Sequence, residues 1–582
     1  MTILSHAYAL SDPNTLVSFN PTDPVFSGTQ IPVTGLTAGE TLVGIDVRPL
    51  NGDLYALGVN AAADTATLYT ISPLTGVATM VGTFGPVLGL DLPASGYGFD
   101  FNPVTGGIRV TTDGLETGID LNFRVNPSTG LITAQDTPIN PAPVDISGVA
   151  YTNNETNNGG VTTLYTLDSF SDQLMIQGGP NNVPSPNTGV QFAVGPVGVD
   201  FFTASFDIPP GVDTLASGFP VPSGSGLALL TLFGPGGPTE LYSIDLVTGF
   251  GTPIGPFPFL GVSGLAILNP PSGADFNIDG RGDILFRQDS GQVYVWEMNG
   301  LQIKEEGSPP HAPVTTDWHV QGVGDFNGDF TSDFLWRQDG TGQVYVWEMK
   351  GQQVQTEGAV FHAFVTDDWH VQGVGDFNGD GNSDVLWRQD GSGQVYVWEM
   401  NGQTVTDEGA VAHAPVTSDW HFQGVGDFNG DGNSDVLWRQ DGSGQVYVWE
   451  MNGQTVTDEG AVAHAPVTDD WHVQGIGDFN GDGNSDVLWR QDGSGQVYLW
   501  EMNGQLVQTE GAVAHAPVTS DWHVESVNDF SGDGKSDVLW RQDGSGQVYV
   551  WQMNGQQVQA EGAVAHAPVP SDWQIFSDLN FI

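Results

Sequence analysis

Residues 375–425 read GDFNGDGNSDVLWRQDGSGQVYVWEMNGQTVTDEGAVAHAPVTSDWHFQGV. Side chains alternate in strand fashion over 385–389 and 394–400, and the turn sequence DGSG separates these two segments. This pattern predicts a β-hairpin. Two further short strands are expected at 403–410 and 420–428. The stretch therefore predicts four strands, the number found in one blade of a β-propeller.

This stretch belongs to a set of six tandem repeats. The dipeptide Asp-Phe recurs in steps of 50, 51, 51, 51 and 51 residues, and we number the repeats 1 to 6 by Asp275, Asp325, Asp376, Asp427, Asp478 and Asp529. Repeat 1 lacks the strand that precedes this dipeptide elsewhere, and residues 572–576 (DWQIF) match the missing strand. The sequence therefore predicts a six-bladed ring that both ends of the domain close. Asn580-Phe581 also aligns with Asp275-Phe276 and would compete for the same place.

The first half of the chain shows a looser repeat. Equivalent first strands are expected at 44–47, 98–101, 148–151, 205–208 and 264–267. The last of these has no partner strands after it, whereas the segments 7–10 and 16–19 have no first strand before them. Joining them closes a ring of about five blades, and the long stretch from 205 to 249 leaves room for another.

Composition places the domain boundary. All 17 Trp and all three Lys lie after Pro270-Pro271. We therefore predict an N-terminal propeller-like domain over 1–270 and a six-bladed propeller with four-stranded blades over 271–582. The predicted fold class is all-β, with two β-propellers in tandem.

The charge of the chain excludes several classes of partner. The 69 Asp and Glu against 13 Lys and Arg give a net charge of −56, and there is no cysteine. Such a surface repels phosphate backbones and anionic headgroups, so we expect no nucleic-acid partner and no membrane insertion. Disulfides, thiolate nucleophiles and Cys-ligated metals are also excluded. The N-terminus lacks the features of a secretory signal, and no apolar run is long enough to span a bilayer.

Each repeat carries the pattern Asp-x-Asn-x-Asp-Gly-x-x-Asp or a close variant of it. Oxygen ligands at positions 1, 3, 5 and 9, with a glycine for the sharp bend at position 6, suit Ca²⁺. An EF-hand is excluded, because position 12 is Trp387 in repeat 3 and strands flank the loop. The candidate ligands are Asp275, Asn277, Asp279 and Asp283; Asp325, Asn327, Asp329 and Asp333; Asp376, Asn378, Asp380 and Asp384; Asp427, Asn429, Asp431 and Asp435; Asp478, Asn480, Asp482 and Asp486; and Asp529, Ser531, Asp533 and Asp537.

The alternative interpretation is that Asp, Asn and Gly recur here because they form good turns. Three acidic groups within nine residues repel one another without a cation, which favours the metal site. Phe330 replaces the glycine in repeat 2 and Ser531 replaces the asparagine in repeat 6, so we expect those two loops to bind metal weakly or not at all.

These residues carry a family resemblance. The segment DFNGDGNSDVLWRQDGSGQVYVW resembles the FG-GAP or VCBS repeats of bacterial surface proteins, which are related to the calcium-loop blades of integrin alpha chains. The resemblance covers residues 273–582 and implies a calcium-stabilised propeller used for binding or adhesion outside the cell. The first half is similar to an uncharacterised bacterial family of propeller-like domains, which implies a fold and no activity.

Three other residue types recur once or more in each repeat. Trp387 and Trp398 lie on alternating strands, so we expect them to pack between blades, whereas Trp420 is the better candidate for an exposed sugar platform. Arg388 is expected to pair with Asp390 or Glu399, and a ring of ligand-facing arginines is the alternative. For the histidines, such as His413 and His421, we expect hydrogen bonds to loops rather than a transition-metal site.

The sequence contains no nucleophile elbow, phosphate loop or His-rich zinc motif, so we expect no enzyme, no catalytic residue and Ca²⁺ as the sole cofactor. We predict a calcium-binding protein, secreted or at a bacterial surface without an N-terminal signal peptide, that binds a glycan or an extracellular protein. Two alternatives stay open. One is a structural subunit that self-associates into a filament or surface layer, and the other is a polysaccharide-active enzyme with its carboxylates among the many acids.

Overall fold

The computed structural model describes residues 6–11, 14–21, 24, 29–50, 52–85, 89–90, 96–112, 120–141, 144–154, 161–209, 212, 224–234, 236–259, 261–268 and 273–576. These residues form two compact units, 6–268 and 273–576, which we call the N-terminal and the C-terminal unit. The helical turns among them are the 3₁₀ turns η1 (Pro180–Asn182) and η2 (Pro186–Thr188). Within the described part of the chain, we find no helix with the length and apolar character that crossing a membrane requires.

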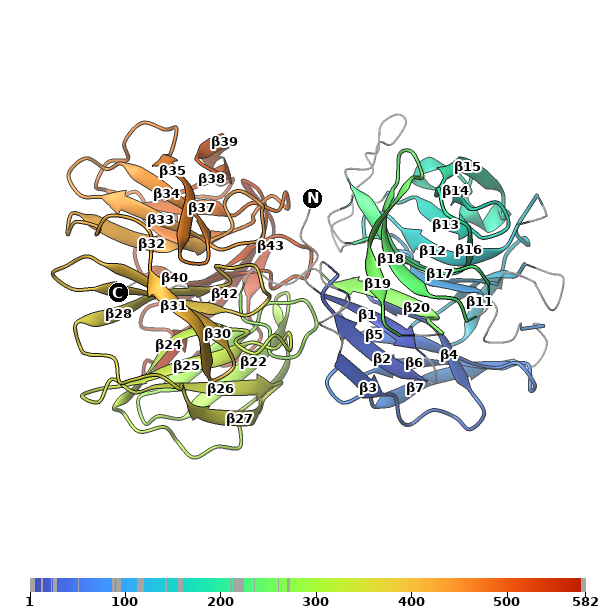
Figure 1. The fold of residues 1–582 in the computed structure, drawn as a ribbon, viewed down its shortest axis with the longest axis horizontal. Coiled ribbons are helices and arrows are strands. Elements are labelled where there is room, and N and C mark those ends of the chain that lie inside the picture. Colours follow the sequence, from blue (N-terminus) through green and yellow to red (C-terminus); the bar gives the residue numbers. More distant parts are fainter. Residues whose placement is uncertain are drawn as a thin grey trace. The chain divides into compact units, whose positions relative to one another are not determined.

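The N-terminal unit is drawn in blue to green in Figure 1. Its strands are β1 (His6–Ser11), β2 (Thr15–Phe19), β3 (Thr29–Pro32), β4 (Thr41–Val47), β5 (Leu54–Asn60), β6 (Thr65–Ile71), β7 (Ala78–Phe84), β8 (Tyr97–Phe101), β9 (Ile108–Thr112), β10 (Asn122–Val125), β11 (Ile132–Gln135), β12 (Ile146–Tyr151), β13 (Leu164–Asp168), β14 (Gln173–Gln177), β15 (Gln191–Pro196), β16 (Phe201–Asp207), β17 (Ser225–Leu232), β18 (Thr239–Asp245), β19 (Gly251–Phe257) and β20 (Gly264–Leu268).

These strands form antiparallel sheets of four strands each. Four sheets take consecutive strands, β4–β7, β8–β11, β12–β15 and β16–β19, and another pairs β20 with β1, β2 and β3. Ala7 lies opposite Ile267 in the β1–β20 pair, so the prediction that the end of this half joins its beginning is confirmed. The inner strands β20, β4, β8, β12 and β16 contact one another in a closed cycle.

The C-terminal unit is drawn in yellow-green to red in Figure 1. Its strands are β21 (Ile284–Gln288), β22 (Val293–Asn299), β23 (Gln302–Gly307), β24 (Trp318–Gly324), β25 (Asp333–Gln338), β26 (Val344–Lys350), β27 (Gln353–Ala359), β28 (Trp369–Gly375), β29 (Asp384–Gln389), β30 (Val395–Asn401), β31 (Thr404–Ala410), β32 (Trp420–Gly426), β33 (Asp435–Gln440), β34 (Val446–Asn452), β35 (Thr455–Ala461), β36 (Trp471–Gly477), β37 (Asp486–Gln491), β38 (Val497–Asn503), β39 (Leu506–Ala512), β40 (Trp522–Asn528), β41 (Asp537–Gln542), β42 (Val548–Asn554), β43 (Gln557–Ala563) and β44 (Trp573–Phe576).

Consecutive groups of four strands, from β24–β27 to β40–β43, form antiparallel sheets, and β44 joins β21, β22 and β23 in a further sheet. Gln288 lies opposite Trp573 and Leu285 opposite Phe576, which confirms that the segment 572–576 completes the sheet of repeat 1. The predicted competition by Asn580-Phe581 lies outside the described residues. The protein is all-β, and its four-stranded sheets are arranged like propeller blades, as the sequence predicts.

Hydrophobic cores of the C-terminal unit lie between neighbouring sheets. Phe377 and Leu386 pack against Trp438 of the next sheet. Trp387 and Trp398 are 1% and 3% exposed, and their ring centroids lie 4.8 Å apart. The expectation that these two tryptophans fill the space between sheets is confirmed, because alternate residues of a strand face opposite neighbours.

Candidate functional site

The candidate metal loops connect the first two strands within a sheet in repeats 2 to 6. In repeat 3 the loop begins after β28 and ends where Asp384 opens β29. Asp376 Oδ1 accepts hydrogen bonds from the backbone N–H of Gly379 at 2.7 Å and of Asp380 at 3.2 Å, and its Oδ2 accepts from Gly381 at 2.8 Å. Position 1 therefore organises the turn, and the carboxylate lies inside it.

The last aspartate of the loop ties two strands together. Asp384 is fully buried; its Oδ2 accepts from the Phe377 N–H at 3.0 Å and its Oδ1 from the Met400 N–H at 2.9 Å. Asp333, Asp435, Asp486 and Asp537 bond to the equivalent methionine N–H of their own repeats. Position 9 thus holds the loop on the sheet in addition to any role as a ligand.

Neighbouring loops are joined into a closed ring. The backbone N–H at position 8 of each loop donates to the carbonyl oxygen at position 1 of the loop before it. The pairs are Ser332 to Asp275, Ser383 to Asp325, Ser434 to Asp376, Ser485 to Asp427, Ser536 to Asp478 and Gly282 to Asp529, at 2.6 to 2.8 Å. Each loop is therefore hydrogen-bonded through its backbone to the loop on either side.

Burial disfavours the charged form of these carboxylates. It raises the pKa of Asp376 to about 6 and that of Asp384 to about 8, and the neighbouring aspartates add to both shifts. Burial and the adjacent Asp279 likewise raise the pKa of Asp275 to about 8. Hard oxygens of this kind fit a divalent cation, whose charge offsets the burial and the mutual repulsion of the acids.

The acids of one loop do not converge tightly in this structure. Among the described residues, three carboxylates offer oxygens within 4.8 Å of one another only at Asp46, Asp100 and Asp207, in the N-terminal unit. The loop carboxylates instead accept backbone hydrogen bonds, as above. Metal binding at a loop therefore requires its acids to draw together.

Basic side chains lie beside three of the loops, which the sequence analysis missed. Lys304 Nζ on β23 lies 3.1 Å from Asp279 Oδ2 in loop 1. Lys535, at position 7 of loop 6, lies against Gly481 of loop 5, and Arg281, at position 7 of loop 1, lies against Gly532 of loop 6. Loops 3 and 4 instead meet the neutral Asn433 and Asn484 at the corresponding places. The donor set therefore fits a cation best in repeats 3 and 4.

Loop 2 retains its shape without the usual glycine. Phe330 adopts a left-handed backbone with φ of 70°, where repeat 3 has Gly381 with φ of 87°. A residue with a Cβ atom is strained in this region. The backbone N–H of Phe330 still donates to Asp325 Oδ2 at 2.7 Å.

The buried aspartates of the N-terminal unit occupy equivalent places on the inner strands β4, β8 and β16. Asp46 Oδ2 accepts from the Phe101 N–H and Asp207 Oδ2 from the Ile267 N–H, both at 2.7 Å, and Asp100 Oδ1 accepts from the Tyr151 N–H at 3.3 Å. Each bond reaches the next sheet. Burial raises the pKa of Asp207 to about 7 and also raises those of Asp46 and Asp100 well above their ordinary value, with the neighbouring acids adding to the shift in Asp46 and Asp100. The repeated first-strand pattern was visible in sequence, but the convergence of these side chains was not.

The predicted carboxylate pairing of the repeated arginines is wrong. Arg388 Nη1 donates to the Trp420 carbonyl at 2.9 Å, its Nη2 donates to the Thr417 carbonyl at 3.0 Å, and the guanidinium lies over the ring of Trp438. The side chain extends from β29 toward the next sheet, where its forked donors reach two backbone carbonyls instead of Asp390. Arg388 thus joins two sheets through backbone carbonyls instead of pairing with an acid.

The histidines form two sets. His413 Nδ1 lies 2.6 Å from the Ala414 carbonyl oxygen, and its Nε2 lies 3.2 Å from the Glu459 carboxylate of the next sheet. The His413 ring packs at a tilt against the ring of Trp449. His421 contacts Asp441 Oδ2 through Nε2 at 2.8 Å. The expectation of hydrogen bonding to loops is confirmed for both sets, because Ala414 and Asp441 lie in loops.

A hollow of about 860 Å³ opens among the sheets β28–β31, β32–β35 and β36–β39. Its polar lining includes His370 and Gln372 on β28, Arg388 on β29 and Asp390 after it, His421 and Gln423 on β32, and His472 on β36. Side chains that can both donate and accept hydrogen bonds thus gather there from three neighbouring sheets.

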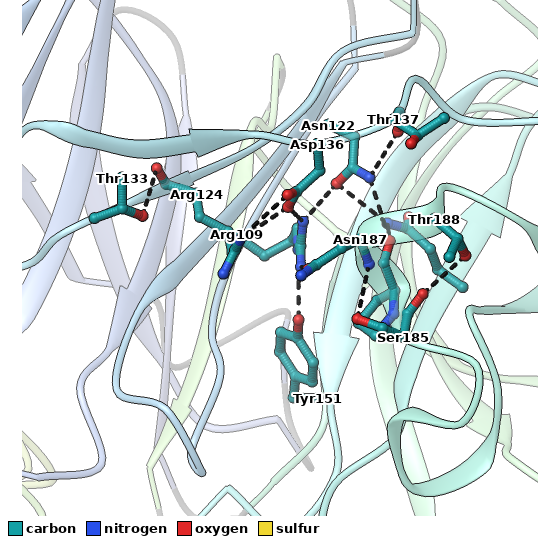
Figure 2. Close-up of polar contacts among 12 residues, drawn as sticks. Arg109, Asn122, Arg124, Thr133, Asp136, Thr137, Tyr151, Ser185, Asn187 and Thr188 are labelled. Carbon is teal, nitrogen blue, oxygen red and sulfur yellow. Dashed lines mark hydrogen bonds and ion pairs between the residues drawn. The ribbon is translucent and has the colours of Figure 1, made fainter.

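A buried arginine network lies in the N-terminal unit (Figure 2). Arg109 is 2% exposed, and it donates to Asn122, Asp136 and Asn187 at 2.6 to 2.7 Å and to the Tyr151 hydroxyl at 3.4 Å. These partners come from β10, the segment after β11, η2 and β12. Because its donors have protein acceptors, the network holds two sheets and the η2 segment together.

Family models match both halves of the chain. Residues 325–387, 376–438 and 427–489 each match an FG-GAP-like repeat. Residues 325–489 are FG-GAP-like repeats. Residues 15–266 match a domain of unknown function, DUF4394. The family assignment made from the loops of the second half is confirmed, and the first half belongs to an uncharacterised domain family as expected.

Solved structures give weaker similarities, and no curated protein matches the chain. A Dos1 propeller is 11% identical, with 67% of this chain and 87% of that chain covered and a TM-score of 0.23. A GH74 xyloglucanase from Xanthomonas campestris is 11% identical, with 98% and 92% covered and a TM-score of 0.26. A nidogen/laminin complex is 10% identical, with 51% of this chain and 99% of that chain covered and a TM-score of 0.33. Similarities this low carry no argument about the function of the FG-GAP-like repeats or of the first half.

Proposed function

We propose that the protein is a non-enzymatic, calcium-binding pair of propellers, secreted or exposed at a cell surface, that binds a glycan or a protein partner. The observation that carries the proposal is the closed ring of candidate loops. Because every loop is hydrogen-bonded to the next, a cation bound in one loop also stabilises the neighbouring sheet. FG-GAP-like repeats in the same segment support this interpretation.

The residues that would hold Ca²⁺ are those at positions 1, 3, 5 and 9 of each loop, and repeats 3 and 4 fit best. In repeat 3 these are Asp376, Asn378, Asp380 and Asp384. The ion would supply positive charge that offsets the burial and the mutual repulsion of these carboxylates. Its effect in this proposal is rigidity of the C-terminal unit, with no chemical step.

The partner would be recognised on the surface of the sheets. The hollow lined by His370, His421 and His472 offers neutral and ionisable hydrogen-bonding groups, and the net charge of −56 disfavours anionic ligands. Hydroxyl-rich glycans and protein segments without excess acid are therefore the partners that the chemistry allows.

Differential scanning calorimetry of the full chain tests the calcium proposal. We expect Ca²⁺ to raise the melting temperature of the C-terminal unit, and a chelator to lower it. All Trp lie in this half, so tryptophan fluorescence reports on this unit alone. Mg²⁺ is the control, because it prefers rigid six-coordinate sites and keeps its water ligands. Equal melting in Ca²⁺ and in chelator would refute the proposal.

Two other functions are separated from this one by simple measurements. A structural subunit would appear as ordered polymers in electron microscopy of native material. A polysaccharide-active enzyme would release product from a polysaccharide library. Binding to a glycan array in calcium buffer without either result is what the proposal predicts.

A further inference from the structure

One connection in the C-terminal unit departs from its near-identical siblings. Phe361 and Phe364 lie between β27 and β28, in the sequence AVFHAFV. The residues at the place of Phe361 are Pro310, Ala412, Ala463, Ala514 and Ala565, and those at the place of Phe364 are Pro313, Pro415, Pro466, Pro517 and Pro568. The other five connections therefore show that this loop needs neither phenylalanine to fold.

Both phenylalanines are presented to solvent. Phe361 is 79% exposed and Phe364 is 67% exposed. Neither side chain contributes much to a core at that exposure. Adjacent exposed aromatic rings on an acidic, polar surface are typical of an interaction site.

The two rings flank a hollow with aromatic walls. One part, of about 300 Å³, is lined by Phe364, Trp369, Tyr396 and Trp398, and Trp387 also lines it. A second part, of about 460 Å³, continues past Phe361 and shares Phe364 and Trp398 with the first. Each part is large enough for a single six-membered ring and too small for a folded partner.

Polar groups of both kinds lie in the same hollow. The indole Nε1 of Trp387, a residue 1% exposed, has no hydrogen-bond partner, which leaves a buried donor unsatisfied. The Glu408 carboxylate lies 3.0 Å from His362 Nε2 and retains further acceptor capacity. The Trp387 nitrogen has almost no accessible surface, so Glu408 is the polar group that a ligand hydroxyl can reach in the hollow. The same indole nitrogen is unpaired in Trp336, Trp438, Trp489 and Trp540, so the phenylalanines are what distinguish this junction.

These features match one ligand chemistry. A hexopyranose has an apolar C–H face for the aromatic walls and hydroxyls that donate to a carboxylate. An acidic sugar is disfavoured by Glu408 and by the net charge of −56, and a second copy of this chain carries the same charge. We propose that the Phe361–Phe364 hollow is a subsite for a single neutral hexopyranose residue of a glycan. This proposal rests on the glycan-binding form of the proposed function.

The test compares the full chain with the variant Phe361→Ala/Phe364→Pro, which restores the sequence of the sibling loops. Titration calorimetry in calcium buffer uses neutral methyl hexopyranosides, with methyl glucuronide as the acidic control. We expect the wild type to bind a neutral glycoside and the variant to bind it at least about tenfold more weakly, with the same melting temperature. Ala463→Phe/Pro466→Phe, made in the double variant, should restore binding at another junction.

Several results would overturn the subsite. These are equal binding by wild type and double variant, equally tight binding of the glucuronide, binding of none of the glycosides, and a self-association that the variant abolishes. Preferential binding of an apolar basic peptide would likewise show a protein site instead. If a glycan array still binds both proteins equally, the proposed function survives and only this subsite fails. A missing calcium shift in melting refutes the calcium proposal whatever the glycosides show.

Discussion

Arg109 Nη1 lies 2.6 Å from Asp136 Oδ2 in the interior of the N-terminal unit, and their side chains are 2% and 7% exposed. Asp136 also accepts from Arg124 Nε at 2.9 Å and from its Nη2 at 3.0 Å. One carboxylate thus contacts two guanidinium groups (Figure 2). The Arg109 side chain is buried, whereas that of Arg124 is partly accessible to water.

Replacing Arg109 tests this network. Arg109→Met leaves Asn122, Asn187 and Asp136 without their shared donor, and we expect it to lower the free energy of unfolding of the N-terminal unit by about 3–5 kcal/mol. The matched control is Arg124→Met, whose side chain is 36% exposed, where solvent screening limits the loss to about 1 kcal/mol. Urea unfolding followed by hydrogen exchange of β9 and β10 measures both. Equal losses would contradict the assignment.

The buried aspartates predict a pH dependence of the N-terminal unit. Burial raises the pKa of Asp207 from 3.8 to about 7, so the folded state binds its proton more tightly than the unfolded state. The contribution of Asp207 to the free energy of unfolding is therefore fully present below pH 4. It decreases as the pH rises to about 7, by up to about 1.4 kcal/mol per pH unit for each such group.

Hydrogen exchange of β16 at pH 4.5 and pH 7.5 measures this slope. Asp207→Asn keeps an acceptor oxygen and removes the titration, so its slope should be smaller. A wild type that is more stable at pH 7.5 than at pH 4.5 in this strand would contradict the assignment.

Two variants separate metal binding from loop structure. Asp380 Oδ1 accepts from the Asn382 N–H at 2.9 Å, and an asparagine can retain that bond. We expect Asp380→Asn/Asp431→Asn to reduce the stabilisation by Ca²⁺ while melting in chelator is unchanged. Asp384→Asn loses one of two buried backbone acceptors and should cost about 1–3 kcal/mol even in chelator. Fluorescence melting of both variants with and without Ca²⁺ decides between a ligand and a purely structural loop.

We expect the packing of neighbouring sheets in the C-terminal unit to depend on the hydrogen bonds that the forked side chain of Arg388 donates. Arg388→Lys keeps the charge but loses the fork that reaches the Trp420 and Thr417 carbonyls, and we expect a loss of about 1–3 kcal/mol. Asp390→Asn should have little effect on this packing, because Asp390 contacts His370 and not Arg388. A larger loss of stability for Asp390→Asn than for Arg388→Lys would instead support the carboxylate pairing that the sequence predicts.

Much of the fold could be predicted because the sequence of each repeat indicates its own strands and turns. Alternation places Trp387 and Trp398 on buried faces, and the match of residues 572–576 to a missing strand shows where the ring closes. The partner of Arg388 could not be predicted, since it is a backbone carbonyl 29 to 32 residues away. A sequence shows nearby acids but not which backbone carbonyls of a neighbouring sheet come within reach of a side chain.

The sequence by itself determined the β architecture, the family of the second half and the chemistry of the candidate loops, because these are local patterns repeated at a fixed period. Only the tertiary structure decided which groups meet. It brings Asp46, Asp100 and Asp207 together from three strands, places Lys304 beside loop 1, and leaves Phe361 and Phe364 exposed beside an aromatic hollow. Ring closure brings the three aspartates of different repeats side by side, and strand pairing within one sheet brings Lys304 to loop 1. Periodicity encodes neither of these distances.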